Sequence, residues 1–396
     1  MVKIRTGLLS ASLLLGLSAC SLFNSEEDVV VMDPVPQTTN EFEAKVVWQK
    51  QVGKGVEDYY SQLRPELAYD SVFAAARFGQ VHGYGLDGTL LWKQDLSKVE
   101  SNQRFSGNTN NARLSGGLTA AYQSVFVGSE NADVFSLSAE TGEIQWQARV
   151  DGEVLARPAV DDSNVVISTS NGFLIALDAF DGSERWKVEI DQPSLTLRSK
   201  AAPVVSNGLV VLGRSDGKLA FYLLENGRQV FESRLANPKG STEIDRIVDL
   251  DSQPIVEGPL VYAVAYNGSL VNIDLRDGQE QWRRAYSAFR DLSISGDDLF
   301  VVDAADVLYS VAANNGIERW SQQQFGYRGL TPAAVDYQYV VVGDSEGYLY
   351  WIDRDSGVIV SQKQIDDAGL YTAPVVGSEN MYVQTRSGKL IAFERQ

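Results

Sequence analysis

The stretch that decides the fold is residues 171–186, which read Asn-Gly-Phe-Leu-Ile-Ala-Leu-Asp-Ala-Phe-Asp-Gly-Ser-Glu-Arg-Trp. The apolar run at 173–177 predicts a strand, and residues 178–182 predict a tight turn. Aspartate side chains accept hydrogen bonds from nearby amides, and glycine takes positive φ without steric cost, so this turn has the residue types it needs. A second strand then carries Trp186, four residues after the turn glycine. The stretch therefore predicts a β-hairpin with an aromatic residue at a fixed position.

This hairpin recurs along nearly the whole chain at intervals of about 40–50 residues, the range of four-stranded propeller blades. The aromatic position of the repeat is occupied by Trp48, Trp92, Trp146, Trp186, Phe231, Trp282 and Trp320, and by Ser361 in the last complete repeat. We expect the tryptophans to wedge between neighbouring blades. An irregular pair of β-sandwiches is the alternative, but it would not hold turn and tryptophan at a fixed distance. Eight such positions predict eight blades.

The two ends of the repeat array are incomplete. The last repeat, residues 381–396, ends before an aromatic position of its own, and Trp48 has no complete repeat before it. We therefore expect an N-terminal strand around residues 45–49 to form the outermost strand of the final blade, which would cover both open sheet edges. The predicted fold class is all-β: an eight-bladed β-propeller of four-stranded blades over residues 42–396, closed by an N-terminal strand.

The N-terminus is typical of an exported lipoprotein. In residues 1–19, Lys3 and Arg5 precede an apolar run that is shorter than the about 20 residues of a membrane span. The run ends Leu-Ser-Ala-Cys, which resembles the bacterial lipoprotein box, so Cys20 is the predicted lipidation site. A plain secretory signal with a chance cysteine is the alternative. Ser21 departs from the aspartate of the inner-membrane retention signal, which implies the periplasmic face of the outer membrane.

Composition limits the remaining possibilities. Residues 20–41 are acidic and contain prolines, which predicts a flexible tether. A net charge of −18 disfavours nucleic acid as a main partner. Because Cys20 and His82 are the single cysteine and histidine of the chain, a disulfide, a cysteine metal cluster or a two-histidine metal site cannot form within it. The sequence predicts no catalytic residue, no cofactor and no metal site.

The pattern Ala-x-Asp-x-x-Asp-Gly-x-x-x-Trp at residues 176–186 resembles the tryptophan-docking motif of pyrroloquinoline-quinone-type (PQQ-type) propellers. Periplasmic quinoprotein dehydrogenases share that fold with the BamB family, the lipoproteins of the machinery that inserts β-barrels into the outer membrane. The chain is similar to the BamB family over nearly its full length, including residues 20–30, 240–246 and 342–352. The resemblance implies a non-enzymatic scaffold of the outer-membrane β-barrel assembly complex.

Two irregular stretches interrupt the repeats, at residues 193–198 and 242–253. Inter-blade loops of a propeller gather at one end of the ring and form a binding face there. In the first stretch, alternation places Leu195 and Leu197 on one side of an extended segment. The second stretch alternates acidic with apolar residues. From these residues alone, core leucines and solvated turn acids are the favoured interpretation.

The resemblance implies a docking site instead, for the periplasmic (POTRA) domains of BamA, the barrel-forming subunit. Leu195 and Leu197 would make the apolar contact, and Arg198 would contribute a charged fork. Asp249 and Asp251 would supply a carboxylate pair that either orients Arg198 or accepts hydrogen bonds from the partner.

Two other function classes are compatible with a propeller. A PQQ-dependent periplasmic dehydrogenase needs a redox cofactor, a cation and a general base. The dehydrogenases that resemble this fold also carry adjacent cysteines, which this chain lacks. A sugar- or peptide-binding propeller would use exposed aromatics or free strand edges. Strand addition by a nascent outer-membrane β-barrel protein would be a secondary role, which the sequence does not locate.

Overall fold

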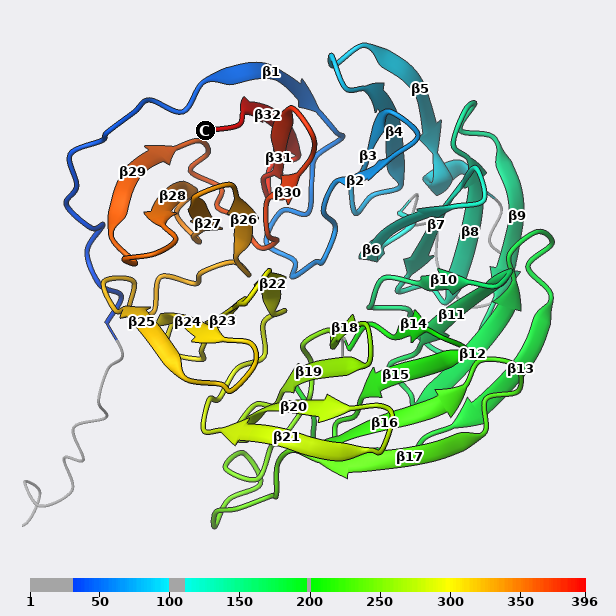
Figure 1. Ribbon diagram of the computed structural model, residues 1–396. Coiled ribbons are helices and arrows are strands. Elements are labelled where there is room, and N and C mark those ends of the chain that lie inside the picture. The colour runs from blue at the N-terminus through cyan, green and yellow to red at the C-terminus, as the bar shows by residue number, and fades with distance from the viewer. Residues whose placement is uncertain (1–30, 100–110, 198–200) are drawn as a thin grey trace, which may run out of the picture. The chain divides into compact units, whose positions relative to one another are not determined.

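Eight four-stranded antiparallel sheets form the fold of residues 33–396 (Figure 1). They come from a computed structural model that describes residues 31–99, 111–197 and 201–396. The sheets stand around a ring as the blades of a propeller, with the first strand of each blade nearest the axis, which confirms the predicted fold class. The described residues contain one helical element, the 3-10 turn η1 (Leu96–Lys98), and no helix in this part of the chain is long and apolar enough to cross a membrane.

Seven blades are built from consecutive strands, ordered from the axis outward. Blades 1 and 2 contain β2 (Glu66–Ala68), β3 (Ser71–Ala75), β4 (Gln80–Gly85), β5 (Leu90–Asp95), β6 (Leu114–Ala121), β7 (Ser124–Ser129), β8 (Asp133–Ser138) and β9 (Ile144–Arg149). Blades 3 and 4 contain β10 (Ala159–Asp161), β11 (Asn164–Ser168), β12 (Phe173–Asp178), β13 (Glu184–Glu189), β14 (Val204–Ser206), β15 (Leu209–Gly213), β16 (Lys218–Leu223) and β17 (Gln229–Arg234).

The second half of the ring repeats this order until its last sheet. Blades 5 and 6 contain β18 (Ile255–Glu257), β19 (Leu260–Val264), β20 (Leu270–Asp274), β21 (Gln279–Arg284), β22 (Ser293–Ser295), β23 (Asp298–Val302), β24 (Leu308–Ala312) and β25 (Glu318–Gln322). Blade 7 contains β26 (Ala334–Asp336), β27 (Tyr339–Gly343), β28 (Tyr348–Asp353) and β29 (Ile359–Gln364). Blade 8 contains β30 (Val375–Val376), β31 (Asn380–Gln384), β32 (Lys389–Glu394) and, as its outermost strand, β1 (Val46–Gln51).

The hydrophobic core lies between neighbouring blades, because the middle strands of a blade are buried on both faces. Side chains alternate along a strand, so β12 serves two interfaces. Ile175 and Leu177 pack against blade 2, for example on Phe126, whereas Leu174 and Ala176 pack against blade 4. This arrangement explains why the strand reads as a continuous apolar run in the sequence.

The tryptophans join consecutive blades, as predicted. Trp146 at the end of blade 2 donates its indole N–H to the carbonyl oxygen of Ala179 in blade 3, 2.9 Å away. Gly182 of that turn has φ +73°, and a Cβ added to it would lie 2.7 Å from the indole of Trp146. Because the turn glycine has no side chain, the tryptophan of the preceding blade can pack directly against the turn. The same indole-to-carbonyl bond is made by Trp48, Trp92, Trp186, Trp282 and Trp320.

Two joints lack a tryptophan and are held differently. At the joint between blades 4 and 5, Phe231 has no N–H to donate, and Arg283 instead donates to the carbonyl oxygens of residues 234 and 235, at 3.0 and 3.1 Å. At the joint between blades 7 and 8, Ser361 donates its hydroxyl to the carbonyl oxygen of Phe42, 2.7 Å away. The ring of Phe42 lies 6.0 Å from that of Trp351. The N-terminal segment thus occupies the joint where the repeat lacks its tryptophan.

Strand β1 closes the ring, also as predicted. It pairs with β32 in antiparallel register, with Trp48 opposite Ala392. The preceding residues 33–41, which the sequence assigns to the tether, belong to the same compact unit as the ring and hydrogen-bond to β29. Thr38 donates to the carbonyl oxygen of Ile359 (2.9 Å), and Asn40 exchanges two hydrogen bonds with Gln362. These contacts satisfy backbone groups on the outer edge of blade 7, which would otherwise be open.

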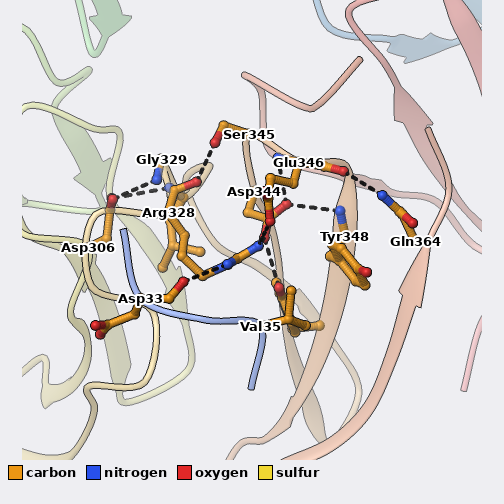
Figure 2. A network of polar contacts seen from close by, with 12 residues as sticks. Asp33, Val35, Asp306, Arg328, Gly329, Asp344, Ser345, Glu346, Tyr348 and Gln364 are labelled. Carbon is orange, nitrogen blue, oxygen red and sulfur yellow. Dashed lines mark hydrogen bonds and ion pairs between the residues drawn. The ribbon is translucent and has the colours of Figure 1, made fainter. Parts of the chain in front are cut away.

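A buried arginine holds the start of this segment (Figure 2). Arg328, with 1 % of its side chain exposed, donates to the backbone carbonyl oxygen of Asp33 and to Asp344, each at 2.8 Å, and also pairs with Glu346. The amide of Asp33 donates in turn to the carbonyl oxygen of Gly326, at 2.9 Å. A buried guanidinium is stable only when its donors are satisfied. The carbonyl oxygen of Asp33 is therefore one of the acceptors that satisfy Arg328, together with the carboxylates of Asp344 and Glu346.

Candidate functional site

The described parts of the inter-blade segments lie at the same end of the ring, which we call the loop face. In an antiparallel blade, the connection to the next blade leaves from the same end as the connection between the second and third strands. The described segments 190–197, 201–203 and 235–254 therefore lie on one face with the connections 214–217 and 265–269. Two backbone bonds join them there: Tyr266 donates to Asp249 (2.9 Å) and Leu250 donates to Arg214 (3.3 Å).

The structure brings the two irregular stretches of the sequence into contact. The amide of Leu197 donates a hydrogen bond to Oδ2 of Asp249. Leu195, two residues earlier, is 42 % exposed, and Leu197 itself is half-buried. Arg198 lies outside the described residues, so its side chain is not placed. Four of the five residues named from the sequence are thus described, and two of them are directly bonded.

Burial of these residues is the reverse of what the residue types suggest. Asp249 is fully buried and Asp251 is 6 % exposed, whereas Leu195 points its apolar side chain to the surface. The interpretation as core leucines with solvated turn acids therefore does not describe this face. Instead, buried carboxylates lie beneath a segment that exposes a leucine.

The environment of Asp249 is unusual for a carboxylate. Burial raises the pKa of Asp249 to about 7, and the charge of Asp251 acts in the same direction, while the amide of Leu197 acts against both. Its Oδ1 atom is buried and has no hydrogen-bond partner in the described part of the chain. Among the described residues, Asp249 thus uses its bonded oxygen to hold the backbone at Leu197.

Sequence reasoning missed other residues of the loop face. Ile244 is 72 % exposed, whereas Val248, four residues later, is buried. Tyr60 and Tyr371, from blades far apart in sequence, lie with ring centroids 5.4 Å apart. Nothing in the local sequence pairs these tyrosines, because they become neighbours only when the ring closes.

Two other buried polar residues, His82 and Asp306, have structural partners. His82 in β4 is buried and bonds the hydroxyl of Tyr84 (2.8 Å), and burial lowers the pKa of His82 to about 4. Asp306 pairs with Arg290 at 2.6 Å and accepts from the amide of Gly329 at 2.7 Å. These contacts tie segments of the ring together.

The fold and its joints define a class of protein. Eight four-stranded blades, joined by an indole hydrogen bond from one blade to the turn of the next, make this a tryptophan-docked β-propeller of the PQQ type. A family model described as outer membrane protein assembly factor BamB matches residues 77–322 and 306–396. The chain belongs to this BamB family.

Individual relatives agree with this assignment. The chain is 43 % identical to outer membrane protein assembly factor BamB of Yersinia pestis over 98 % of each chain. It is 40 % identical to the protein of that name from Escherichia coli K12, again over 98 % of each chain. The crystal structure of BamB from Moraxella catarrhalis superimposes with a TM-score of 0.78 at 23 % identity, covering 89 % of this chain and all of that one, and supports the fold.

Proposed function

We propose that this chain is a non-enzymatic scaffold of the outer-membrane β-barrel assembly complex, and that it binds the periplasmic POTRA domains of BamA through its loop face. Its family is described as outer membrane protein assembly factor BamB. The relatives from Yersinia pestis and Escherichia coli K12 carry that name and align with 98 % of this chain, at 43 % and 40 % identity. In this proposal Cys20 carries the lipid that anchors the protein to the periplasmic face of the outer membrane.

One observation supports the docking site above all: the bond between the Leu197 amide and Asp249. Two stretches that depart from the repeat meet there, and an exposed leucine, Leu195, stands beside the bond. Interfaces draw most of their free energy from a few apolar or arginine anchors that are buried on binding. We assign Leu195 and Leu197 as the apolar anchors and Arg198 as a charged contact.

The two acids have a different role in this proposal. Because Asp249 is fully buried, it cannot meet a partner directly; it positions the backbone of residues 195–197 by accepting the Leu197 amide. Asp251, which is nearly buried beside it, completes the carboxylate pair. A positioning role predicts that Asp249→Asn, which keeps an acceptor oxygen, is tolerated better than Asp249→Ala.

The test is capture of BamA from solubilised outer membranes, comparing the native protein with Leu195→Ala/Arg198→Ala. Ile317→Ala is a matched control, since Ile317 is 57 % exposed on a strand-connecting turn at the other end of the ring. We expect capture by the native protein and the Ile317 variant, and loss of capture by the folded double variant. Equal capture of BamA by the native protein and both variants would show that the docking site lies elsewhere. If none of the three proteins captured BamA, the scaffold role would be contradicted.

Membrane attachment is tested separately. Cys20→Ser should release the protein from the membrane fraction, while leaving its melting temperature unchanged. Retention of the Cys20 variant in the membrane fraction of cells that lack BamA would contradict lipid anchoring at this residue.

A further inference from the structure

A cavity of about 160 Å³ lies on the ring axis towards the loop face. All eight blades line it, each through the segment that leads into its innermost strand or through that strand itself. Its volume is similar to the about 150 Å³ of an engineered apolar cavity that accepts benzene. The space is therefore sufficient for a molecule with one aromatic ring.

Three arginines line this cavity, and two of them are neutralised. Arg157 pairs with Glu66 at 3.1 Å, and Arg290 pairs with Asp306 at 2.6 Å. Arg64, the third, makes no ion pair or hydrogen bond with any residue that the structure describes, although it is partly buried. The cavity thus contains one guanidinium without a counter-charge in contact.

The electrostatics of Arg64 agree with this arrangement. Burial lowers the pKa of Arg64, and the neighbouring charge of Arg157 acts in the same direction. Asp291 lines the same cavity and attracts Arg64, but it lies beyond ion-pair distance and accepts the backbone amide of Gln253 at 2.8 Å. Glu66 also attracts Arg64, but its carboxylate is paired with Arg157. A partly desolvated cation without a carboxylate in hydrogen-bond contact gains from a bound anion.

Apolar and aromatic side chains form much of the remaining wall, together with the polar Gln62, Gln253 and Thr372. Tyr60 and Tyr371 stand next to each other, and the guanidinium of Arg386 lies over the ring of Tyr371, 4.6 Å from its centre. Leu118 and Leu330 line the same space. These side chains would receive an apolar body better than a hydrated one.

We propose that the axial cavity binds a small organic carboxylate, whose carboxyl group pairs with Arg64 and whose apolar body lies against Tyr60 and Tyr371. A planar carboxylate matches the guanidinium fork in two hydrogen bonds. A ligand with one negative charge would balance the charge of Arg64, whereas a ligand with two negative charges would also be repelled by the carboxylate of Asp291. Such a group is found on a free aromatic acid and at the C-terminus of a peptide with an apolar last residue. The proposal stands apart from the docking function, since Arg64 is not among the residues assigned to BamA.

Titration calorimetry on the purified full-length protein tests the proposal. The probes are phenylacetate, its neutral isostere phenylacetamide, and a tripeptide that ends in phenylalanine with either a free or an amidated C-terminus. We expect each free acid to bind at least about tenfold more tightly than its amide, the ratio of a charge-assisted hydrogen bond. Preference for phenylacetate would identify a free acid as the ligand, and preference for the peptide would identify a chain end.

Arg64→Gln should abolish the preference for the acid. Arg276→Gln is the matched control, because Arg276 lies on an exposed turn of blade 5, with 74 % of its side chain exposed. Since Arg64 makes no hydrogen bond or ion pair in the described chain, the Gln variant should keep its melting temperature and its capture of BamA. Equal binding of acids and amides, an unchanged preference in Arg64→Gln, or no binding of any probe by the native protein would each overturn the proposal.

Discussion

Gly182 lies against the indole of Trp146 in the preceding blade, so closely that an added Cβ would come within 2.7 Å of the ring. Its φ of +73° is the second reason for glycine at this position. The same contact recurs between a turn glycine and the tryptophan before it at Gly88, Gly142, Gly227, Gly316 and Gly357. Each of these joints between blades therefore consists of a tryptophan from one blade and a turn glycine from the next.

Gly182→Ala should destabilise the ring more than Gly208→Ala. Gly208 has nearly the same backbone, φ +74°, but nothing lies within 4 Å of its Cβ position. Left-handed strain alone should lower the free energy of unfolding by about 1–2 kcal/mol in both variants. The clash with Trp146 should cost Gly182→Ala a further about 1–3 kcal/mol. Equal losses in denaturant unfolding would mean that the indole contact contributes nothing.

Deleting residues 42–50 should destabilise the whole ring, because these residues contribute most of β1 and the Phe42 that fills the joint between blades 7 and 8. We expect a single thermal transition at lower temperature, and faster amide exchange even in blade 4, on the far side of the ring. Lys45→Ala is the control: it removes only an exposed ion pair with Glu394 and should cost less than about 1 kcal/mol. Faster exchange limited to blade 8 would contradict cooperative closure.

Arg328→Met should be strongly destabilising, because it leaves the buried carboxylate of Asp344 without its cation. Breaking a buried ion pair by removing one partner costs about 3–5 kcal/mol. It should also free the backbone of Asp33, which would appear as faster amide exchange at residues 33–41. A double change, Arg328→Met with Asp344→Asn, should recover part of the loss, because Asn removes the unpaired charge and keeps an acceptor for the amides of Glu346 and Tyr348. Unchanged stability of the single variant would show that the cluster in Figure 2 adds nothing to the fold.

Asp249 should make stability depend on pH in the direction opposite to that of an ordinary paired acid. Its pKa is about 7 in the folded chain, against an ordinary 3.8, so the folded state holds the proton more tightly than the unfolded state. Stability contributed by this group is full below about pH 4 and is lost as the pH rises to about 7. Asp249→Asn should remove this loss. The difference in unfolding free energy between native and variant should therefore change between pH 4 and 7, and a constant difference would contradict the raised pKa.

Much of the fold follows from the sequence because its signals are local and repeated. The hairpin turn, its glycine and the tryptophan lie within 16 residues of one another at 171–186, and eight copies fix the blade number. Ring closure also follows, since the incomplete first and last repeats complement each other, as the pairing of β1 with β32 confirms.

The contacts that could not be predicted join distant parts of the chain. The bond from Arg328 to Asp33 spans 295 residues, and Ser361 replaces the repeat's tryptophan because Phe42, 319 residues away, fills the joint. Burial of Asp249 was equally hidden, because an acid in an irregular loop is ordinarily solvated. The residues of the candidate docking site were predicted from the sequence through a family resemblance. That Leu195 is exposed and Asp249 is buried became evident only from the structure.

The most direct test of the central claim is the affinity of the purified protein for the isolated periplasmic domains of BamA, measured by titration calorimetry. We predict that Leu195→Ala weakens binding at least about tenfold, as expected for an interface anchor. Ile317→Ala should bind as the native protein does, and Asp249→Asn should bind more tightly than Asp249→Ala. Native affinity in Leu195→Ala, with the ring still folded, would contradict the assignment of the loop face as the docking site.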